Sequence, residues 1–463
     1  IERPYFFNIQ KEVFVCCLIV SLRCVFWVAP SIRGGIDLPR PASQRAAAFI
    51  LTAAMLTTLA APAFAGTWYI EDGDITVKAG ETKGTNKVSQ GANQEVEDTD
   101  TIITNRNEGT ASSNTVTIDA NGKNDKVEVT LKDVNIDTSS RNKAAVSVTG
   151  SGNTTIKLDG DNALKSDTSR SGIYGSGSLT ISGGENDSLT AQGGSGANGI
   201  SSSGSLTISG GTVTATGGNS TGIVGYGGSG IYSSSGVAIS GGAVTANGGD
   251  SKDGYGGNGI YSSSVAISGG TVKAAGGNGK DGYGGNGISS TSTTISGGTV
   301  TANGGSGNSS GGDGIHSNGV TISGGTVNTT GGNGTNSNGG EGIYGRKGID
   351  LSGSLELTAK AGSPNGKALS QDGNELDLNT IKDKLGPGAK VTVTDANGET
   401  KQVSIPRPVE PEKPVIPEES SSSSDGGSSA PSAPVSSIPG LTVTDKSGAV
   451  ISYTSTQSGN TLT

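Results

Sequence analysis

The sequence predicts an all-β protein, a parallel β-helix of about 28 residues per coil with three short strands in each coil and a capping segment at each end. A Gly-Ile pair recurs seven times within residues 171–360, at spacings of 27 to 31 residues. Most repeats continue with Ile-Ser-Gly-Gly and then a Thr-Val-Thr-Ala type strand closed by Gly-Gly. These short motifs leave no room for a helix, so each repeat should form one solenoid coil.

The composition alone is typical of disorder, because 80 of the 463 residues are glycine and aromatic residues make up 4%. The periodicity argues against disorder. Within a repeat the apolar residues fall two apart, as in Val265 and Ile267, which is the alternation of a strand with one buried face. A disordered glycine and serine tract has no reason to keep that register through seven copies.

The first 65 residues predict export. Residues 46–65 are apolar and end in Ala63-Phe64-Ala65, as in a secretory signal peptide with an Ala-x-Ala cleavage site. A transmembrane anchor is the alternative, but the polar sequence that follows favours cleavage. Residues 1–44 are interpreted as a mis-called upstream segment. We expect a mature chain that starts near Gly66, is secreted or displayed on the cell surface, and does not insert into a membrane.

The remaining chain divides by composition. We expect an N-terminal cap over residues 66–109, the β-helix over 110–360, and a C-terminal cap over 361–405. The C-terminal cap should hold a short helix between Leu376 and Leu385 and a hairpin around Asn397-Gly398. Residues 406–439, rich in Pro, Glu and Ser, predict a linker. Residues 440–463 predict the start of a truncated further module, through which the protein could attach to a cell wall.

The charge of the chain excludes nucleic acid as a partner. Without the first 65 residues, which hold 6 of the 32 basic and 3 of the 41 acidic residues, the chain has a net charge of −12. An acidic surface repels nucleic-acid phosphates.

Two rows of aromatic residues are the candidate binding site. If the Gly-Ile isoleucines point inward, the residues that follow them point outward, and a second set lies four residues before the Gly-Ile pairs. Aromatic rings offer a platform for the apolar face of a sugar. Alternatively, the rings merely stabilise adjacent coils. The predicted carbohydrate-binding residues are Tyr174, Tyr232, Tyr261 and Tyr344 in the first set and Tyr226, Tyr255 and Tyr283 in the second.

Acidic residues after the third strand of several repeats are candidate calcium ligands: Asp250, Asp253, Asp281 and Asp313. Oxygen ligands on neighbouring coils would suit calcium, which takes six to eight of them. Residues 276–283 fit a calcium-binding nonapeptide motif once, but that motif should recur every nine residues and here it does not. Solvated turn residues are the alternative interpretation.

Catalysis has little support in the sequence. His316 is the single histidine of the chain, and Arg346 is the only arginine in residues 171–360. The repeats therefore lack the basic cluster that a β-helical polysaccharide lyase needs to abstract a proton or to hold a uronate. We expect a protein that is not an enzyme.

The sequence also resembles a known family. The shared motifs are Gly-Ile-Tyr, Thr-Ile-Ser-Gly-Gly-Thr-Val-Thr-Ala and Gly-Gly-Asn-Gly, together with Trp68-Tyr69-Ile70, Leu158-Asp159-Gly160 and Asn162-Ala163-Leu164-Lys165. Over about residues 66–405 the chain resembles the β-helical carbohydrate-binding domain of anaerobic Gram-positive bacteria. The resemblance implies a right-handed parallel β-helix that binds plant cell-wall polysaccharide, including pectic acid, with bound calcium. No ligand residue of the family can be matched one by one.

The residues and the resemblance together predict non-catalytic binding of an extracellular polysaccharide, with pectic acid and glucan as candidate ligands. The alternative function is a structural or adhesive surface rod that binds a host protein or cell. Sugar binding predicts an exposed, contiguous row of tyrosines, whereas a spacer predicts no such row.

Overall fold

The computed structural model describes residues 65–107, 109–220, 222 and 225–408, together with two short strands near the C-terminus. The predicted signal peptide, most of the predicted linker and most of the predicted further module lie outside the described residues. The chain divides into two units, residues 1–407 and 408–463. In the second unit the described strands β33 (Gln457–Ser458) and β34 (Thr461–Leu462) form an antiparallel pair.

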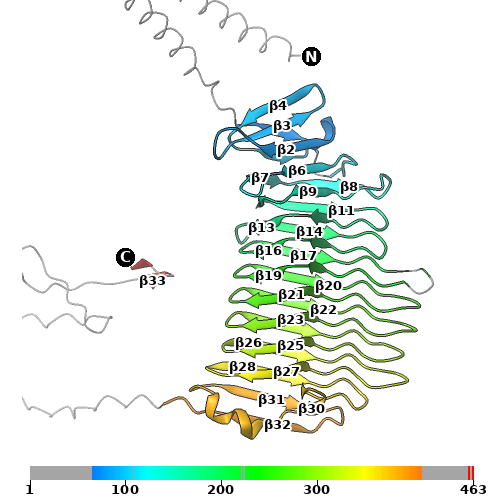
Figure 1. Ribbon diagram of the computed structural model, residues 1–463, viewed down its shortest axis with the longest axis vertical. Helices are drawn as coiled ribbons and strands as arrows, with labels where there is room; N and C mark the ends of the chain where they lie inside the picture. The colour runs from blue at the N-terminus through cyan, green and yellow to red at the C-terminus, as the bar shows by residue number, and fades with distance from the viewer. Residues whose placement is uncertain are drawn as a thin grey trace, which may run out of the picture. The chain divides into compact units, whose positions relative to one another are not determined.

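The first unit is the predicted all-β solenoid, with about 10 coils roughly 28 residues apart (Figure 1). One set of strands, which we call sheet B, runs through every coil in the order β8-β11-β14-β17-β20-β22-β24-β26-β28-β31, with β32 at its end. Its strands are β8 (Asn135–Asp137), β11 (Asp161–Lys165), β14 (Ser188–Gln192), β17 (Thr212–Thr216), β20 (Ala243–Asn247), β22 (Thr271–Ala275), β24 (Thr299–Asn303), β26 (Gly325–Thr330), β28 (Leu355–Lys360), β31 (Lys390–Thr394) and β32 (Thr400–Ser404). Neighbouring strands up to β31 pair in parallel.

The other strands, sheet A, form two parallel ladders in the first coils. The first ladder holds β2 (Ile75–Ala79), β6 (Val116–Ala120), β9 (Val146–Gly150), β12 (Ile173–Gly175), β15 (Ile200–Ser202) and β18 (Ile231–Ser233). The second holds β1 (Thr67–Tyr69), β5 (Ile102–Thr104), β7 (Lys126–Lys132), β10 (Asn153–Asp159), β13 (Ser178–Ser182), β16 (Ser205–Ile208) and β19 (Gly236–Ile239).

The two ladders of sheet A merge at β21 (Ile260–Ile267), which pairs with both β18 and β19. The later strands β23 (Ile288–Ile295), β25 (Ile315–Ile322) and β27 (Ile343–Leu351) are also continuous. The coils therefore have three strands before Ile260 and two after it. The change goes with the loss of one residue, because Ile231 and Ile239 are eight apart whereas Ile260 and Ile267 are seven apart. In β27 the spacing from Ile343 to Leu351 is again eight, and the strand stays continuous with a register shift against β25.

The core is a set of apolar ladders, as the alternation predicts. The Gly-Ile isoleucines, from Ile173 to Ile343, are 0% exposed, and the valines of sheet B, from Val213 to Val327, are at most 1% exposed. From Ile208 onward, the second glycine of each Ile-Ser-Gly-Gly motif turns the corner into sheet B. Gly270, for example, has φ of 76°, a conformation that side chains disfavour.

Each end of the stack carries antiparallel structure. At the N-terminus β3 (Asn86–Gln90) and β4 (Asn93–Asp98) extend β2 as an antiparallel meander, and a 3₁₀ helix spans Ile70–Asp72. Parallel pairing already begins at β1 and β2, so residues 66–109 contribute both to the coils and to the cap. At the C-terminus are β29 (Leu369–Gln371), β30 (Asn374–Glu375), a 3₁₀ helix over Leu378–Lys384, and the predicted hairpin, formed by β31 and β32.

The glycine-rich segments between sheet B and the next Gly-Ile pair extend to one side of the strands (Figure 1). We call them the glycine arms; the complete ones span residues 248–257, 276–285, 304–312 and 331–340. Their backbones bond within and between coils: Gly285 N donates to Gly277 O in the same arm, and Gly277 N donates to Gly257 O of the preceding arm, both at 2.8 Å. A Cβ on Gly277 would overlap the carbonyl oxygen of Gly249. Much of the glycine content is therefore required by close backbone packing.

Candidate functional site

The residues that follow the Gly-Ile isoleucines form an outward row, as predicted. Strand pairing places Tyr174, Ser201, Tyr232, Tyr261, Ser289, His316 and Tyr344 in register on successive coils. We call this set the first aromatic row. Because each isoleucine is buried and successive side chains alternate in a strand, the row faces solvent. Tyr174 and Tyr261 are 47% and 46% exposed.

The first aromatic row is not continuous. The rings of Tyr232 and Tyr261 lie 5.6 Å apart between centroids and are tilted by 53°. His316 stacks on Tyr344, with centroids 4.8 Å apart and planes 20° apart. Ser289 separates these two pairs. The row therefore consists of aromatic pairs interrupted by serine.

The second set of tyrosines, Tyr226, Tyr255 and Tyr283, lies on the return of the glycine arms and forms what we call the second aromatic row. Tyr226 stacks on Tyr255 at 5.1 Å and 16°, and Tyr255 stacks on Tyr283 at 4.8 Å and 8°. Their side chains are about half exposed, at 61%, 45% and 45%. Because each ring covers a face of the next, this row presents mostly ring edges to solvent. For the second aromatic row, the alternative interpretation therefore applies: the rings stabilise adjacent coils.

Of the four predicted calcium ligands, two accept hydrogen bonds from the backbone of the next coil. Asp250 Oδ1 accepts a hydrogen bond from the backbone N of Asn278 at 2.6 Å, and Asp313 Oδ1 accepts one from the backbone N of Glu341 at 2.7 Å. Asp253 and Asp281 lie 28 residues apart, at equivalent positions of adjacent arms. Among the described residues no group of three or more His, Cys, Asp or Glu side chains could hold a metal ion. Calcium binding stays a prediction.

Asp313 belongs to an electrostatic cluster at the edge of the first aromatic row. Its Oδ2 lies 2.6 Å from His316 Nδ1, and Glu341 occupies the equivalent position one coil later. Burial raises the pKa of Glu341 to about 7, and the Asp313 carboxylate adds to the rise by repulsion. The single histidine is therefore oriented by a carboxylate.

A pocket of about 390 Å³ lies over Ser289. It is lined by Tyr232, Ser233, Ser234, Tyr261, Ser262, Ser263, Ser289, Ser290, Thr291, His316 and Asn318. We call it the Ser289 pocket. Its walls are aromatic and the rest of its lining is hydroxyl and amide, which is the composition expected of a site for an uncharged polar ligand. The sequence signal for it is the serine at position 289, where the adjacent coils carry Tyr261 and His316.

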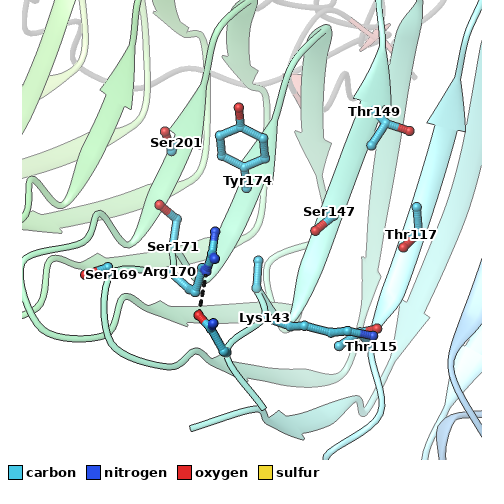
Figure 2. Close-up of a pocket in the computed structure, with 12 residues that line it drawn as sticks. Thr115, Thr117, Lys143, Ser147, Thr149, Ser169, Arg170, Ser171, Tyr174 and Ser201 are labelled. Carbon is cyan, nitrogen blue, oxygen red and sulfur yellow. Dashed lines mark hydrogen bonds between the residues drawn. The ribbon is translucent and has the colours of Figure 1, made fainter. Parts of the chain in front are cut away.

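A second pocket, of about 560 Å³, surrounds Tyr174 (Figure 2). It is lined by Thr115, Thr117, Asn142, Lys143, Ala144, Ser147, Thr149, Ser169, Arg170, Ser171, Tyr174 and Ser201. We call it the Tyr174 pocket. Figure 2 shows Ser147 and Ser201 on either side of Tyr174, with Arg170 and Lys143 on loops at the same opening. The sequence pattern did not reveal this pocket, because basic residues were considered within the repeats at 171–360 and Arg170 lies one position before that range.

The two cations of the Tyr174 pocket differ in their partners. Arg170 Nε donates to Asn142 Oδ1 at 3.1 Å, and within the described residues its guanidinium makes no ion pair. Lys143 Nζ lies 3.0 Å from Asp74 Oδ2, and Arg141 pairs with the same carboxylate at 2.8 Å. Partial burial alone would raise the pKa of Asp74, but hydrogen bonds from Arg141, the Thr115 backbone and Lys143 lower it to about 2. Asp74 is thus an anion at neutral pH, and Arg170 is the cation free for a ligand.

The protein is thus a parallel β-solenoid with an aromatic outer row, and two pockets lie along that row. Comparison with protein-family models, with curated proteins and with solved structures found no match. The resemblance to the β-helical carbohydrate-binding family therefore stays a prediction. In the part of the chain that the structure describes, no helix is long and apolar enough to cross a membrane.

Proposed function

We propose that the face formed by the first aromatic row binds an extracellular polysaccharide, such as a plant cell-wall glucan or pectic acid, without catalysis. The observation that carries the proposal is the row itself. Tyr232, Tyr261, His316 and Tyr344 occupy outward positions of one ladder, interrupted by Ser289. The first three of them border a pocket rich in hydroxyl groups. Aromatic rings with neighbouring hydroxyl groups match the alternating apolar and polar surfaces of a sugar. Such a protein would act at the cell surface or in the medium.

The Tyr174 pocket supports a preference for acidic sugars at that end of the row. A uronate carboxylate accepts hydrogen bonds from a guanidinium in a planar, two-pronged geometry. Arg170 has no carboxylate partner among the described residues, and the ring of Tyr174 stands beside it (Figure 2). A local cation would offset the repulsion that the chain from Gly66 onward, with a net charge of −12, should exert on pectic acid. Calcium remains a further proposed bridge between the acidic arms and uronate groups.

The test is a glycan array on residues 66–408, followed by titration with the glycans that bind. The double variant Tyr232→Ala and Tyr261→Ala should lose affinity for neutral glucan without unfolding, because outward side chains contribute little to the buried ladders. The matched control is Tyr226→Ala with Tyr255→Ala, which removes two tyrosines from the second aromatic row. Equal loss in both double variants, or in neither, would contradict the proposal.

Binding of acidic ligands is tested separately in the same experiment. Arg170→Gln should weaken binding of pectic acid and leave neutral glucan unaffected, whereas a chelator should weaken pectic acid binding only if calcium bridges it. If no glycan on the array binds the wild-type protein, the adhesive rod becomes the better interpretation.

A further inference from the structure

The first aromatic row is interrupted at Ser289, and this gap defines a smaller binding site than the row as a whole. We propose that a single pyranose ring enters the Ser289 pocket and is held between the rings of Tyr261 and His316. The inference rests on the proposed function and deepens it, because it fixes the subsite, the number of sugar rings in contact and the configuration of the sugar. It also assigns Ser289 as the specificity-determining residue.

The spacing of the coils sets the width of the gap. Tyr261, Ser289 and His316 are register partners on three adjacent strands. Adjacent strands lie about 4.8 Å apart, so the outer two backbones are separated by about 9.6 Å. Carbon contacts of about 3.5 to 4.0 Å on each side of an inserted ring require roughly 7 to 8 Å between the aromatic planes, plus the pucker of the sugar. The gap is too wide for the two aromatic rings to touch and wide enough for one sugar.

In the two aromatic pairs of the row, one side of each ring already contacts its partner. Tyr261 contacts Tyr232 on one side, and His316 stacks on Tyr344. The sides of these two residues that remain accessible within the row are the ones that border Ser289. A platform along the whole row would instead require faces that the neighbouring rings already use. A polysaccharide should therefore contact the row at an interruption, with one ring inserted.

The other interruption of the row, at Ser201, borders the Tyr174 pocket, which has a single aromatic residue in its lining. Ser201 lies between Tyr174 and Tyr232 in register but is 8% exposed, whereas Ser289 is half-buried. The Ser289 pocket, unlike the Tyr174 pocket, is lined by Tyr232, Tyr261 and His316 together. Of the two serine interruptions, only the one at Ser289 has aromatic residues of its pocket on both sides.

The chemistry of the pocket selects the sugar. A ring held between two aromatic faces must be apolar on both of its own faces, which requires all ring substituents to be equatorial, as in β-glucose. An axial hydroxyl, as in galactose, would place a polar group against one aromatic face without a hydrogen-bond partner. The equatorial hydroxyls point to the pocket rim, where Asn318 and Thr291 lie. His316 adds a directed group, because Asp313 holds Nδ1 and leaves Nε2 available.

The decisive variant is Ser289→Tyr, which fills the gap with a residue that Tyr232 and Tyr261 already present at the same position. We expect the affinity for cellohexaose to fall about tenfold or more. Thr214→Tyr, which adds a tyrosine at an outward position of β17 on sheet B, should bind like the wild type. Ser289→Ala, which keeps the gap open, should lose less affinity than Ser289→Tyr. Unchanged or stronger binding by Ser289→Tyr would overturn the subsite while leaving glycan binding by the row intact.

A second measurement needs no variant. Because His316 is the only histidine, its imidazole signals in an NMR spectrum belong to one residue. Cellobiose should shift them, and a disaccharide with an axial hydroxyl in each ring should not. Affinity should also reach a plateau at short chain length, since one ring is held. Equal shifts with both sugars, or affinity that grows with each added ring, would exclude the sandwich. Failure of every glycan to bind the wild-type protein would refute the proposed function as well.

Discussion

The ring of Tyr283 lies face to face with that of Tyr255, which is 28 residues earlier in the chain, with the centroids 4.8 Å apart and the planes 8° apart. Tyr255 is covered by Tyr226 on its other side. An aromatic pair contributes about 0.5 to 1.5 kcal/mol beyond its buried area. The second aromatic row should therefore stabilise the glycine arms and contribute little to ligand binding.

We predict that Tyr255→Ala, which removes two stacked contacts, lowers the free energy of unfolding by about 1 to 3 kcal/mol. Tyr226→Ala removes only the contact between Tyr226 and Tyr255 and should lower the free energy of unfolding by about half as much. Chemical denaturation measures both, and titration with glucan should give the wild-type affinity for each variant. A loss of affinity in Tyr255→Ala with unchanged stability would reverse the roles assigned to the two rows.

The glycine arms should be intolerant of any side chain at the positions where backbones meet. Gly277→Ala places a methyl group against the carbonyl oxygen of Gly249 and should destabilise the protein by about 1 to 3 kcal/mol. Gly319→Ala is the control, because a Cβ at Gly319 meets nothing within 4 Å. Its effect should stay within about 0.5 kcal/mol. Thermal unfolding of the two variants checks the prediction, and similar losses in both would contradict it.

The half-buried Glu341 should make stability depend on pH. Its pKa is about 7 in the folded protein, against an ordinary value of 4.5. Between these values the folded state binds more protons than the unfolded state, so the free energy of unfolding should fall as the pH rises from about 4.5 to 7. Glu341→Gln should flatten this slope and stabilise the protein above pH 7. Urea midpoints at pH 5 and pH 8 for both proteins test this; parallel slopes would refute it.

Asp74 should act in the opposite direction. Its pKa of about 2 lies below the ordinary value of 3.8, so its contribution to stability is present above pH 3.8 and is lost as the pH falls through 2. Asp74→Asn should therefore destabilise the protein at pH 7 and match the wild type near pH 2. Hydrogen exchange of β2, whose first residue follows Asp74, reports the loss locally. A destabilisation that is equal at both pH values would instead indicate lost packing.

The coil pattern could be predicted because it repeats. Ile260 and Val272 occupy positions defined by seven copies of one motif, and their burial follows from alternation alone. The hairpin of β31 and β32 was predicted from Asn397-Gly398, a strong local turn signal, and is confirmed. The short helix expected between Leu376 and Leu385 is present as a 3₁₀ helix.

The site was harder to predict because it depends on exceptions to the repeat. Ser289 is informative only once Tyr261 and His316 are known to be its register partners, and register within irregular spacings of 27 to 31 residues cannot be read with certainty. The Tyr174 pocket depends on loop residues, such as Arg170 and Lys143, whose approach is set by the fold. Stacking within the second aromatic row likewise depends on the path of the glycine arms, which the sequence pattern does not specify.

The hydrogen bonds between glycine arms affect which coils can pair with each other during folding. Each arm offers the next one nearly the same donors and acceptors, so a coil between Ile260 and Gly342 could dock against the wrong neighbour with little loss of backbone bonding. Slippage by a whole coil is prevented by features that occur once: the Trp68 indole, which donates to Asp98 at 2.7 Å, and the single strand junction at β21. A gene that gained or lost one repeat between Ile260 and Gly342 would still encode a closed stack.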